Sequence, residues 1–287
     1  MVVNSKQWLA LYSRDVPECQ LSDLQLDSRK VAAGQVFLAL PGVNQHGNQF
    51  IPQALAQGAA LVLTDSGSYA DHRVVVLPEL MQLLPALVAD FYQKPARQLQ
   101  MAAITGTNGK SSSAFFISQL ASLLQRKATV IGTLGYGDIN QLTSLANTTP
   151  HYVDIQRILA GFVAHKVELC AMEVSSHALV QQRVAGMLFD VAVFTNLTRD
   201  HLDYHGSMAE YGAAKARLFT PQLSRAAVIN ISDEFGRKLA TQCELPLWVY
   251  GRMEDCRGFA RYLGYSAVVA VANGYQMMLH SPQGDYQ

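Results

Sequence analysis

The sequence contains 287 residues, 49% of them hydrophobic, which is enough apolar material for a packed core in about two domains. Lys and Arg together number 22, as do Asp and Glu, and the pI is near 7.1. Because these charges are dispersed along the chain, there is no electrostatic reason to expect a nucleic-acid or membrane-surface partner.

The cysteines and the amino-terminal residues indicate a cytoplasmic protein. Cys19, Cys170, Cys243 and Cys256 never form a C-x-x-C pair, so neither a disulfide framework nor a zinc site is expected. Residues 1–14 lack a cationic start followed by an apolar stretch, and no apolar run of membrane-spanning length occurs. We therefore expect a soluble protein without a targeting segment.

Short apolar strands alternate with helical segments over the first hundred residues. Strands are expected at 36–40, 60–64 and 74–77, and helices at 50–57 and 78–92. The polar, proline-containing stretch 93–97 that follows is typical of a linker. We therefore predict a small α/β domain at residues 1–97.

A second α/β series occupies residues 98–287. Its near-continuous apolar strands alternate with helices, which predicts a parallel sheet covered on both faces. The strands are expected at 101–105, 128–131, 167–173, 191–195 and 226–230, and the helices at 113–124, 153–165 and 208–218. Near the end of the chain, 267–272 and 275–279 flank Asn273-Gly274, which is a strong hairpin signal. The predicted fold class is α/β, with a P-loop-type parallel-sheet domain that ends in a smaller, incomplete antiparallel sheet.

The most informative motif follows the first strand of this second domain. It reads Gly106-Thr107-Asn108-Gly109-Lys110-Ser111-Ser112. The glycines would let backbone N–H groups approach phosphate oxygens, Lys110 would add a positive charge, and Ser111 could offer a hydroxyl to Mg²⁺. A general P-loop has a further glycine where this chain has Ile104. The match is partial, and an ordinary strand–turn–helix connection capped by Ser111 or Thr107 stays an alternative.

Polar residues follow two later strands, at the sheet edge where open α/β proteins bind ligands. Glu173 closes the apolar run 167–172, and a buried carboxylate is costly unless it is paired or bound to a metal. Asp200, His201 and Asp203 follow the next strand. Because Mg²⁺ prefers oxygen ligands, ligand preference alone ranks His201 below the aspartates. A surface carboxylate at a helix start and a turn capped by Asp200 are the plainer interpretations.

Lys215 lies on the helix expected at 208–218. A lysine on such a helix is usually a surface residue whose aliphatic chain lies along apolar neighbours. From the residues alone, this is the default interpretation of Lys215.

In their combination, these motifs resemble the Mur ligases, the enzymes that assemble the peptidoglycan stem peptide. Six or more motifs in one order are far more specific than any single one. The segments that carry the resemblance are Asp27-Ser28-Arg29, 36–42, 106–112, Asn147-Thr148-Thr149-Pro150, 173–179, 196–206 and Ala214-Lys215. Within the family, they are similar to the members that add the third amino acid rather than to those that add D-Ala-D-Ala.

The resemblance implies a monomeric, cytoplasmic, ATP-dependent amide ligase that uses Mg²⁺. It would join meso-diaminopimelate or L-lysine to UDP-N-acetylmuramoyl-L-Ala-D-Glu through an acyl phosphate. Residues 106–112 would wrap the ATP phosphates, and the catalytic residues would be Lys110, Glu173, His201 and Lys215. The implied Mg²⁺ ligands are Ser111, Glu173, His201 and Lys215, the last as a carbamate (N6-carboxylysine). The implied substrate-binding residues are Leu26, Ser28, Val43, Asn44, Gln45, Asn147, Thr148, Thr149, Ser175, Gln181 and Arg183.

Members of this family carry a third domain that recognises the incoming amino acid. Its Asp-Asn-Pro-Arg-type segment does not occur in this sequence. We therefore expect an amino-terminal fragment that is inactive in ligation by itself. Two other functions stay open. One is a P-loop NTPase or kinase, which Ile104 and the ordered substrate motifs disfavour. The other is a catalytically silent module that binds the UDP-sugar and ATP.

Overall fold

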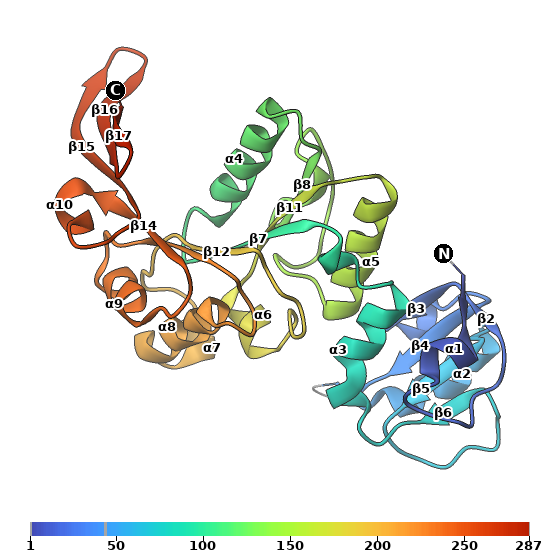
Figure 1. The fold of residues 1–287 in the computed structure, drawn as a ribbon. Helices are drawn as coiled ribbons and strands as arrows, with labels where there is room; N and C mark the ends of the chain where they lie inside the picture. The colour runs from blue at the N-terminus through green and yellow to red at the C-terminus, as the bar shows by residue number, and fades with distance from the viewer. Residues whose placement is uncertain (1, 43–44, 287) are drawn as a thin grey trace. The chain divides into compact units, whose positions relative to one another are not determined.

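The computed structural model describes residues 2–42 and 45–286 (Figure 1). The chain divides into two compact units, Met1–Pro95 and Ala96–Gln287, and the short helix η3 (Pro95–Arg97) lies at the boundary. This boundary falls inside the stretch 93–97 interpreted above as a linker. The roles assigned to the two units stay predictions. Within the described residues, none of the helices combines the length and hydrophobicity that a membrane crossing requires.

The first unit contains a four-stranded parallel sheet. Its strands pair in the order β3-β4-β5-β6. Their bounds are β3 Asp23–Gln25, β4 Gln35–Ala39, β5 Leu61–Thr64 and β6 Val74–Val76. All four residues of β5 are buried, as expected for a parallel strand that is covered on both faces.

Helices and a short two-stranded ladder complete the first unit. They are α1 Ser5–Leu9, α2 Ile51–Ala56, α3 Leu80–Phe91, η1 Ser28–Lys30 and η2 Gly47–Phe50, with the ladder formed by β1 Val3–Asn4 and β2 Gln20–Leu21. Trp8 meets Phe91 edge-on at a ring-centroid distance of 4.9 Å, and Trp8 Nε1 donates to Leu87 O at 2.9 Å. Helix α1 is therefore anchored on α3 by an aromatic contact whose polar N–H is satisfied.

The second unit is organised around one eleven-stranded sheet. The strand order is β10-β9-β8-β11-β7-β12-β13-β14-β15-β16-β17, parallel from β8 to β15 and antiparallel outside them. The bounds are β7 Gln100–Thr105, β8 Ala128–Gly132, β9 Gly135–Asp138, β10 Gln141–Thr143, β11 Leu169–Glu173, β12 Val191–Phe194, β13 Ala227–Asn230, β14 Leu247–Arg252, β15 Tyr262–Val271, β16 Gly274–Ser281 and β17 Gly284–Tyr286.

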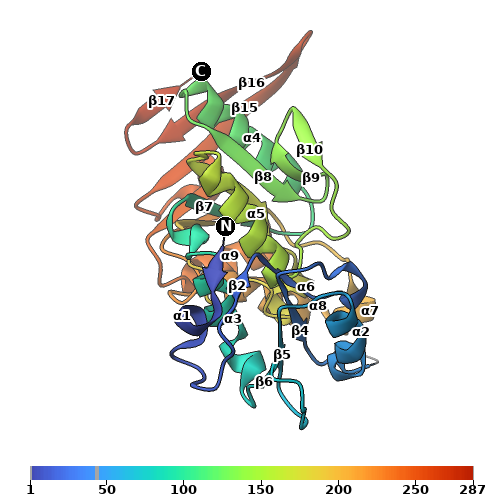
Figure 2. The same cartoon turned by 90° about the vertical axis from the view of Figure 1, so that its right-hand side faces the viewer.

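Several helices pack against this sheet. Their bounds are α4 Lys110–Leu123, α5 Tyr152–Ala164, α6 Ser176–Val180, α7 Leu202–His205, α8 Met208–Ala216, η4 Arg217–Phe219, α9 Glu234–Gln242 and α10 Met253–Cys256. Helix α4 packs on β8 and β11 through a buried cluster of Ile104, Ala114, Val130 and Ala171. Helices α6 and α7 both contact α8, and the three lie together in Figure 2.

The central strand for the site is β7, which pairs with β11 on one side and with β12 on the other. Residues 101–105 are all buried. The register aligns Ile104 with Glu173 of β11 and with Val193 of β12. Because all three strands are parallel, the segments that follow them emerge at the same edge of the sheet.

The predicted α/β class with parallel sheets is confirmed. The predicted hairpin is present as β15 and β16, and it continues the edge of the main sheet. Helix α4 begins at Lys110, three residues before the expected helix at 113–124. The sequence analysis did not identify β14 or α9. In α9 only Gly236, Leu239 and Ala240 are buried, so its apolar signal is weak.

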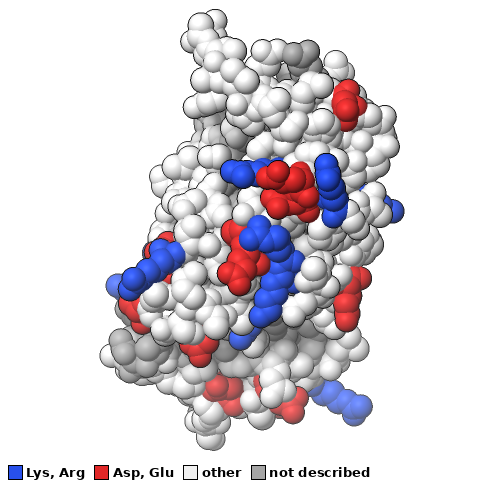
Figure 3. Space-filling model, turned by 90° about the vertical axis from the view of Figure 1, so that its left-hand side faces the viewer, with Lys and Arg blue, Asp and Glu red and all other residues white. Residues whose placement is uncertain are grey.

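Charged residues of both signs are interspersed on the face drawn in Figure 3. Among the described residues visible there, no extended patch of one sign is seen. Exposed ion pairs such as Arg225–Asp190, at 3.7 Å, contribute little to stability. The fold therefore depends on buried apolar packing.

We predict that Phe189→Ala strongly destabilises the second unit. Phe189 is 0% exposed, and its loss should lower the free energy of unfolding by about 3–5 kcal/mol, because a large cavity is left behind. The matched control is Phe116→Ala on α4, which removes a ring that is 62% exposed and should change stability by about 0.5 kcal/mol or less. Denaturant unfolding followed by circular dichroism measures both, and equal effects would contradict this view of the core.

Candidate functional site

The loop between β7 and α4 lies at the carboxyl edge of the central strand. It begins with Gly106 at φ +146° and ends with Gly109 at φ +82°. Both values fall in the region that favours glycine. A Cβ on Gly106 would in addition overlap the hydroxyl of Thr195, which follows β12. The glycine at 106 is therefore required by both the backbone conformation and the close packing.

The segment after β12 holds this loop in place. Asn196 O accepts a hydrogen bond from Thr107 N at 2.8 Å, and Asn196 Oδ1 accepts one from Asn108 N at 3.0 Å. The Thr195 hydroxyl and the Asn196 amide both donate to Asn108 O, at 2.7 and 3.0 Å. The N–H groups of Thr107 and Asn108 are thus engaged inside the protein.

The first turn of α4 provides the free donors. Within the described part of the chain, the N–H groups of Lys110, Ser111 and Ser112 have no intramolecular acceptor, as is usual in the first turn of a helix. The positive end of the dipole of this 14-residue helix therefore lies beside the loop. Backbone N–H groups and a positive dipole end together form an anion-binding arrangement.

Two lysines meet at one carbonyl of the loop. Lys110 Nζ donates to Gly106 O at 3.0 Å and to Thr107 O at 2.8 Å. Lys215 Nζ also donates to Gly106 O, at 2.8 Å. Lys215 is 1% exposed, so its interpretation as a surface lysine is wrong.

Burial changes the protonation of both lysines. It lowers the pKa of Lys215 to about 7, with a further lowering from Lys110 and an opposing effect from Asp200. Burial also lowers the pKa of Lys110, while the carboxylates of Glu173 and Asp200 act in the opposite direction. Lys215 therefore has a substantial neutral fraction near pH 7, unlike an ordinary lysine with a pKa of about 10.4.

Glu173 ends β11 and is 2% exposed. Its Oε1 accepts from Thr133 N at 3.0 Å and its Oε2 from the Thr133 hydroxyl at 3.3 Å. A Cβ on Gly132 would overlap this carboxylate. The carboxylate is thus buried against backbone, with threonine donors as its hydrogen-bond partners, and such a charge is costly without a nearby cation.

A connected hydrogen-bond network joins most of the predicted substrate-binding residues of the second unit. The Thr149 hydroxyl donates to Glu173 O at 2.9 Å and accepts from Ser175 N at 3.0 Å. Arg183 Nη1 donates to Thr149 O at 2.6 Å, and the same guanidinium donates twice to Gln181 Oε1. Thr148 reaches the network through its hydroxyl, 3.0 Å from that of Thr133, and the neighbouring Asn147 is exposed.

His201 directly precedes α7 and lies in the left-handed region at φ +52°. Its ring lies 5.0 Å from that of His177 and 6.0 Å from that of Tyr211, and its Nε2 is 3.4 Å from Asp200 Oδ2. Burial lowers the pKa of His177, and His201 adds to that effect. His177 also lies 5.4 Å from His205, measured between ring centroids, so the three histidine rings form a packed cluster.

The predicted substrate-binding residues of the first unit are described separately. The Ser28 side chain is largely buried, and its hydroxyl donates to Gln53 Oε1 at 2.8 Å. Leu26 N donates to Gln25 Oε1, and the exposed Gln45 accepts at its carbonyl from Gly42 N. Val43 and Asn44 lie outside the described residues.

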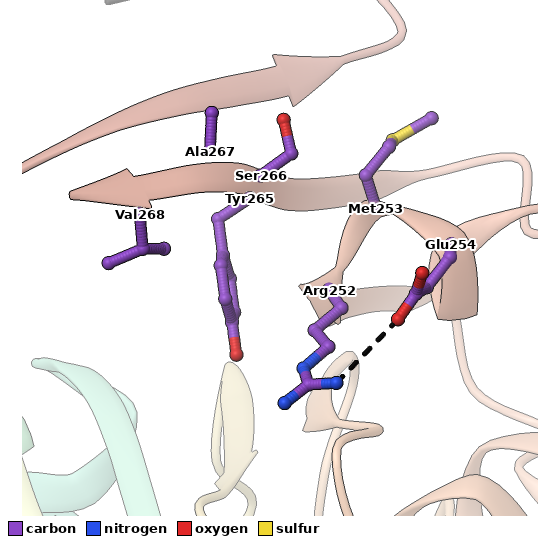
Figure 4. A pocket seen from close by; sticks show the side chains of 7 residues that line it. All are labelled: Arg252, Met253, Glu254, Tyr265, Ser266, Ala267 and Val268. Atoms are coloured by element: carbon purple, nitrogen blue, oxygen red, sulfur yellow. Dashed lines mark ion pairs between the residues drawn. The ribbon is translucent and has the colours of Figure 1, made fainter.

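A separate pocket of about 260 Å³ lies between α10 and β15 (Figure 4). Its lining includes Arg252 and Glu254, which form an ion pair at 3.7 Å. None of the seven labelled residues belongs to the predicted site.

A chain of hydrogen bonds runs through the edge strands near this pocket. Ser266 Oγ is 2.6 Å from His280 Nε2, and His280 Nδ1 is 2.8 Å from Asp285 Oδ1. These residues come from β15, β16 and β17, and the Asp285 side chain is 61% exposed. Because they lie within a paired ladder at an exposed edge, we interpret the chain as a cross-strand network that holds these strands together.

The fold and the loop geometry define an α/β protein of the P-loop type. The family model of the Mur ligase middle domain matches residues 104–285, and that of the Mur ligase catalytic domain matches residues 20–92. The chain therefore belongs to the Mur ligase family, whose members are ATP-dependent ligases that form C–N bonds.

Two kinds of relative support this assignment. The chain is 42% identical, over 270 residues, to a UDP-N-acetylmuramoyl-L-alanyl-D-glutamate–2,6-diaminopimelate ligase from Ectopseudomonas mendocina (strain ymp). That alignment covers 92% of this chain and 55% of the relative, so the chain spans about half of the relative's length. A solved structure of a ligase of the same name superimposes with a TM-score of 0.81 at 28% identity. The alignment covers 100% of this chain and 59% of the ligase chain. The structure of MurF from Acinetobacter baumannii has the same fold, with a TM-score of 0.69 at 19% identity. That alignment also covers 100% of this chain and 59% of the MurF chain.

Several residues of the site were not identified from the sequence. Thr195 and Asn196 fix the loop, Thr133 binds Glu173, and Tyr211 contacts Lys215. Only Tyr211 had a usable signal, because it lies four residues before Lys215 and so on the same face of a helix. The others depend on strand pairing that brings distant loops together.

We predict that Gly106→Ala is more damaging than Gly109→Ala. Both positions have positive φ, so alanine at either should cost about 1–2 kcal/mol of stability. Only at Gly106 would the new Cβ meet Thr195, whereas no atom lies within 4 Å of a Cβ on Gly109. Thermal and denaturant unfolding should therefore show the larger loss for Gly106→Ala, and a larger loss for Gly109→Ala would refute the described loop packing.

Proposed function

We propose that this chain provides the substrate- and ATP-binding part of an amide ligase of peptidoglycan synthesis. The ligase would add the third amino acid, meso-diaminopimelate or L-lysine, to UDP-N-acetylmuramoyl-L-Ala-D-Glu. One observation carries the proposal: Lys110 and the buried Lys215 converge on Gly106 O beside the free N–H groups of α4. The 42% identity to a ligase named for the diaminopimelate reaction supports the choice of reaction.

The ATP phosphates would lie at the amino end of α4. Lys110 and the N–H groups of Lys110, Ser111 and Ser112 would bind them, while Thr107 and Asn108 keep the loop in shape. Lys110 would have to leave the carbonyls of Gly106 and Thr107 in order to reach a phosphate. In the structure, the hydrogen bonds to these two carbonyls hold the Lys110 amine beside the loop.

The residues fit a hard cation such as Mg²⁺. Glu173 is a buried carboxylate whose hydrogen-bond donors are the N–H and hydroxyl of Thr133, and the half-buried Ser111 lies in the first turn of α4. These two, together with His201 and a carboxylated Lys215, would hold the ion through mainly oxygen ligands. When bound, Mg²⁺ supplies positive charge that stabilises the charge on the phosphoryl group during transfer.

The reaction follows from the chemistry of the carboxylate. The γ-carboxylate of the D-Glu residue is a poor electrophile, and transfer of the terminal phosphoryl group of ATP converts it to an acyl phosphate. The amine of the incoming amino acid then attacks, the amide forms and inorganic phosphate leaves. Lys110 and the N–H groups of α4 would offset the repulsion between the carboxylate and the phosphates, and stabilise the charge that develops in the transition state.

Lys215 would act as a carbamate. Attack of its neutral amine on CO₂ forms a C–N bond and releases one proton, and this exchanges a neutral amine for an anion with two oxygen atoms. Its burial and its pKa of about 7 both favour the neutral amine that this step requires. The product offers the oxygen ligands that Mg²⁺ prefers.

Each unit, taken by itself, contains residues that we propose for substrate binding. Asn147, Thr148, Thr149, Ser175, Gln181 and Arg183 would bind the muramoyl-dipeptide, and their hydrogen-bond network supports this proposal. In the first unit, Leu26, Ser28 and Gln45 would contact the UDP end.

We predict that Lys110→Ala weakens ATP binding about 10- to 100-fold, because a charge-assisted hydrogen bond to phosphate is lost. Isothermal titration calorimetry should show unchanged affinity for UDP-N-acetylmuramoyl-L-Ala-D-Glu. The matched control is Lys127→Ala, since the exposed Lys127 donates to His165 O away from the loop. If both ligands lost affinity in Lys110→Ala, Lys110 would be structural. A folded wild-type chain that binds neither ligand would refute the proposed function.

We predict that Lys215 takes up ¹³C-labelled CO₂. The carbamate signal in ¹³C NMR should be present in the wild type and in Lys127→Arg, and absent in Lys215→Arg, because a guanidinium is always protonated and cannot react. The signal should decrease as the pH falls through about 7, where the Lys215 amine becomes protonated. A signal that persists in Lys215→Arg would place the modification elsewhere.

A further inference from the structure

One buried side chain contacts both the β7–α4 loop and Lys215 in the proposed ATP site. Tyr211 lies on α8 and is 1% exposed. Its hydroxyl reaches the β7–α4 loop, and its ring lies beside Lys215 and His201. We propose that Tyr211 is a positioning residue that fixes the loop with its hydroxyl and Lys215 with its ring. This inference rests on the proposed ATP site.

The hydroxyl of Tyr211 completes the hydrogen bonding of Thr107. Thr107 Oγ1 donates to Thr198 O at 3.2 Å and accepts from Thr198 N at 3.0 Å. Either hydroxyl can donate in the contact of 3.2 Å between Thr107 and Tyr211, and the tyrosine is the donor when Thr107 gives its single proton to Thr198 O. Thr107 is then fully satisfied, with one donated and two accepted bonds.

The ring of Tyr211 supports Lys215 from one side. Lys215 Nζ lies over the Tyr211 ring, 4.4 Å from its centroid, and also donates to Gly106 O at 2.8 Å, so the amine has both an aromatic and a carbonyl contact. His205 packs on the same ring at 5.0 Å, and His205 Nε2 is 2.9 Å from Ser176 Oγ on α6. The ring is therefore itself held by a neighbouring helix.

This arrangement explains how a helix sets the geometry of the loop. Tyr211 and Lys215 are separated by one helical turn on α8, so their relative positions are fixed by the helix. Lys215 binds the carbonyl of Gly106, and Tyr211 binds the side chain of the next residue, Thr107. Two consecutive loop residues are thus anchored to one rigid element.

The two parts of the proposal can be tested separately. Tyr211→Phe removes only the hydroxyl, and we expect ATP affinity measured by calorimetry to fall about fivefold to tenfold, because one buried hydrogen bond to the loop is lost. The carbamate signal of Lys215 should be retained, since the ring remains. The matched control is Tyr250→Phe, which removes a hydroxyl that donates to Phe194 O at 3.3 Å in the same unit. This control should leave ATP affinity unchanged.

Tyr211→Leu removes the ring as well, and we expect it to reduce the carbamate signal at least about threefold, because water then reaches the buried amine and favours its protonated, unreactive form. A merely structural role predicts that Tyr211→Phe and Tyr250→Phe lower ATP affinity equally, and that result would overturn the hydroxyl part. An unchanged carbamate signal in a folded Tyr211→Leu would overturn the ring part. A wild-type chain that fails to bind ATP would instead refute the ATP site itself.

Discussion

The parallel pairing of β7 between β11 and β12 is the constraint on which the site depends. It places the glycine loop, the carboxylate of Glu173 and the segment starting at Thr195 at one edge of the sheet. These segments come from three distant parts of the sequence, and only the strand register aligns them. The register also explains the glycine at 106, since the loop packs so closely on Thr195 that a Cβ would not fit.

This edge concentrates charge that the protein itself does not neutralise well. Two lysines donate to a single carbonyl, and Glu173 is buried with hydroxyl and backbone donors. Taking charged groups out of water is costly, and close partners repay this cost only in part. Phosphate oxygens would improve the environment of Lys110, and a divalent cation would improve that of the Glu173 carboxylate. The arrangement is therefore less stable by itself than it would be with such ligands, which is typical of binding sites.

Rigid packing compensates for this electrostatic cost. The rings of His177, His201, His205 and Tyr211 form a contact cluster, and they come from α6, from the residue before α7, from α7 and from α8. His201 is held in a left-handed backbone conformation, which is strained for a residue with a side chain. Such strain persists only where the surroundings determine the conformation, and here the aromatic cluster provides those surroundings. Lys215 is consequently presented to the loop by a helix with little freedom to move.

The sequence by itself determined the alternation of strands and helices, because buried parallel strands are continuously apolar and helices have an apolar period. It also identified the glycine loop and Glu173 as candidates, since their motifs are local, whereas Lys215 became a candidate only through the resemblance to the Mur ligases. Weakly patterned elements such as α9 and β14 were missed, because few of their side chains enter the core. Only the tertiary structure decided that Lys215 is buried, that Asn196 rather than a ligand takes the N–H groups of Thr107 and Asn108, and that Tyr211 contacts the loop. These outcomes depend on which strands pair and in what register, and that information is spread over distant residues instead of residing in any one motif.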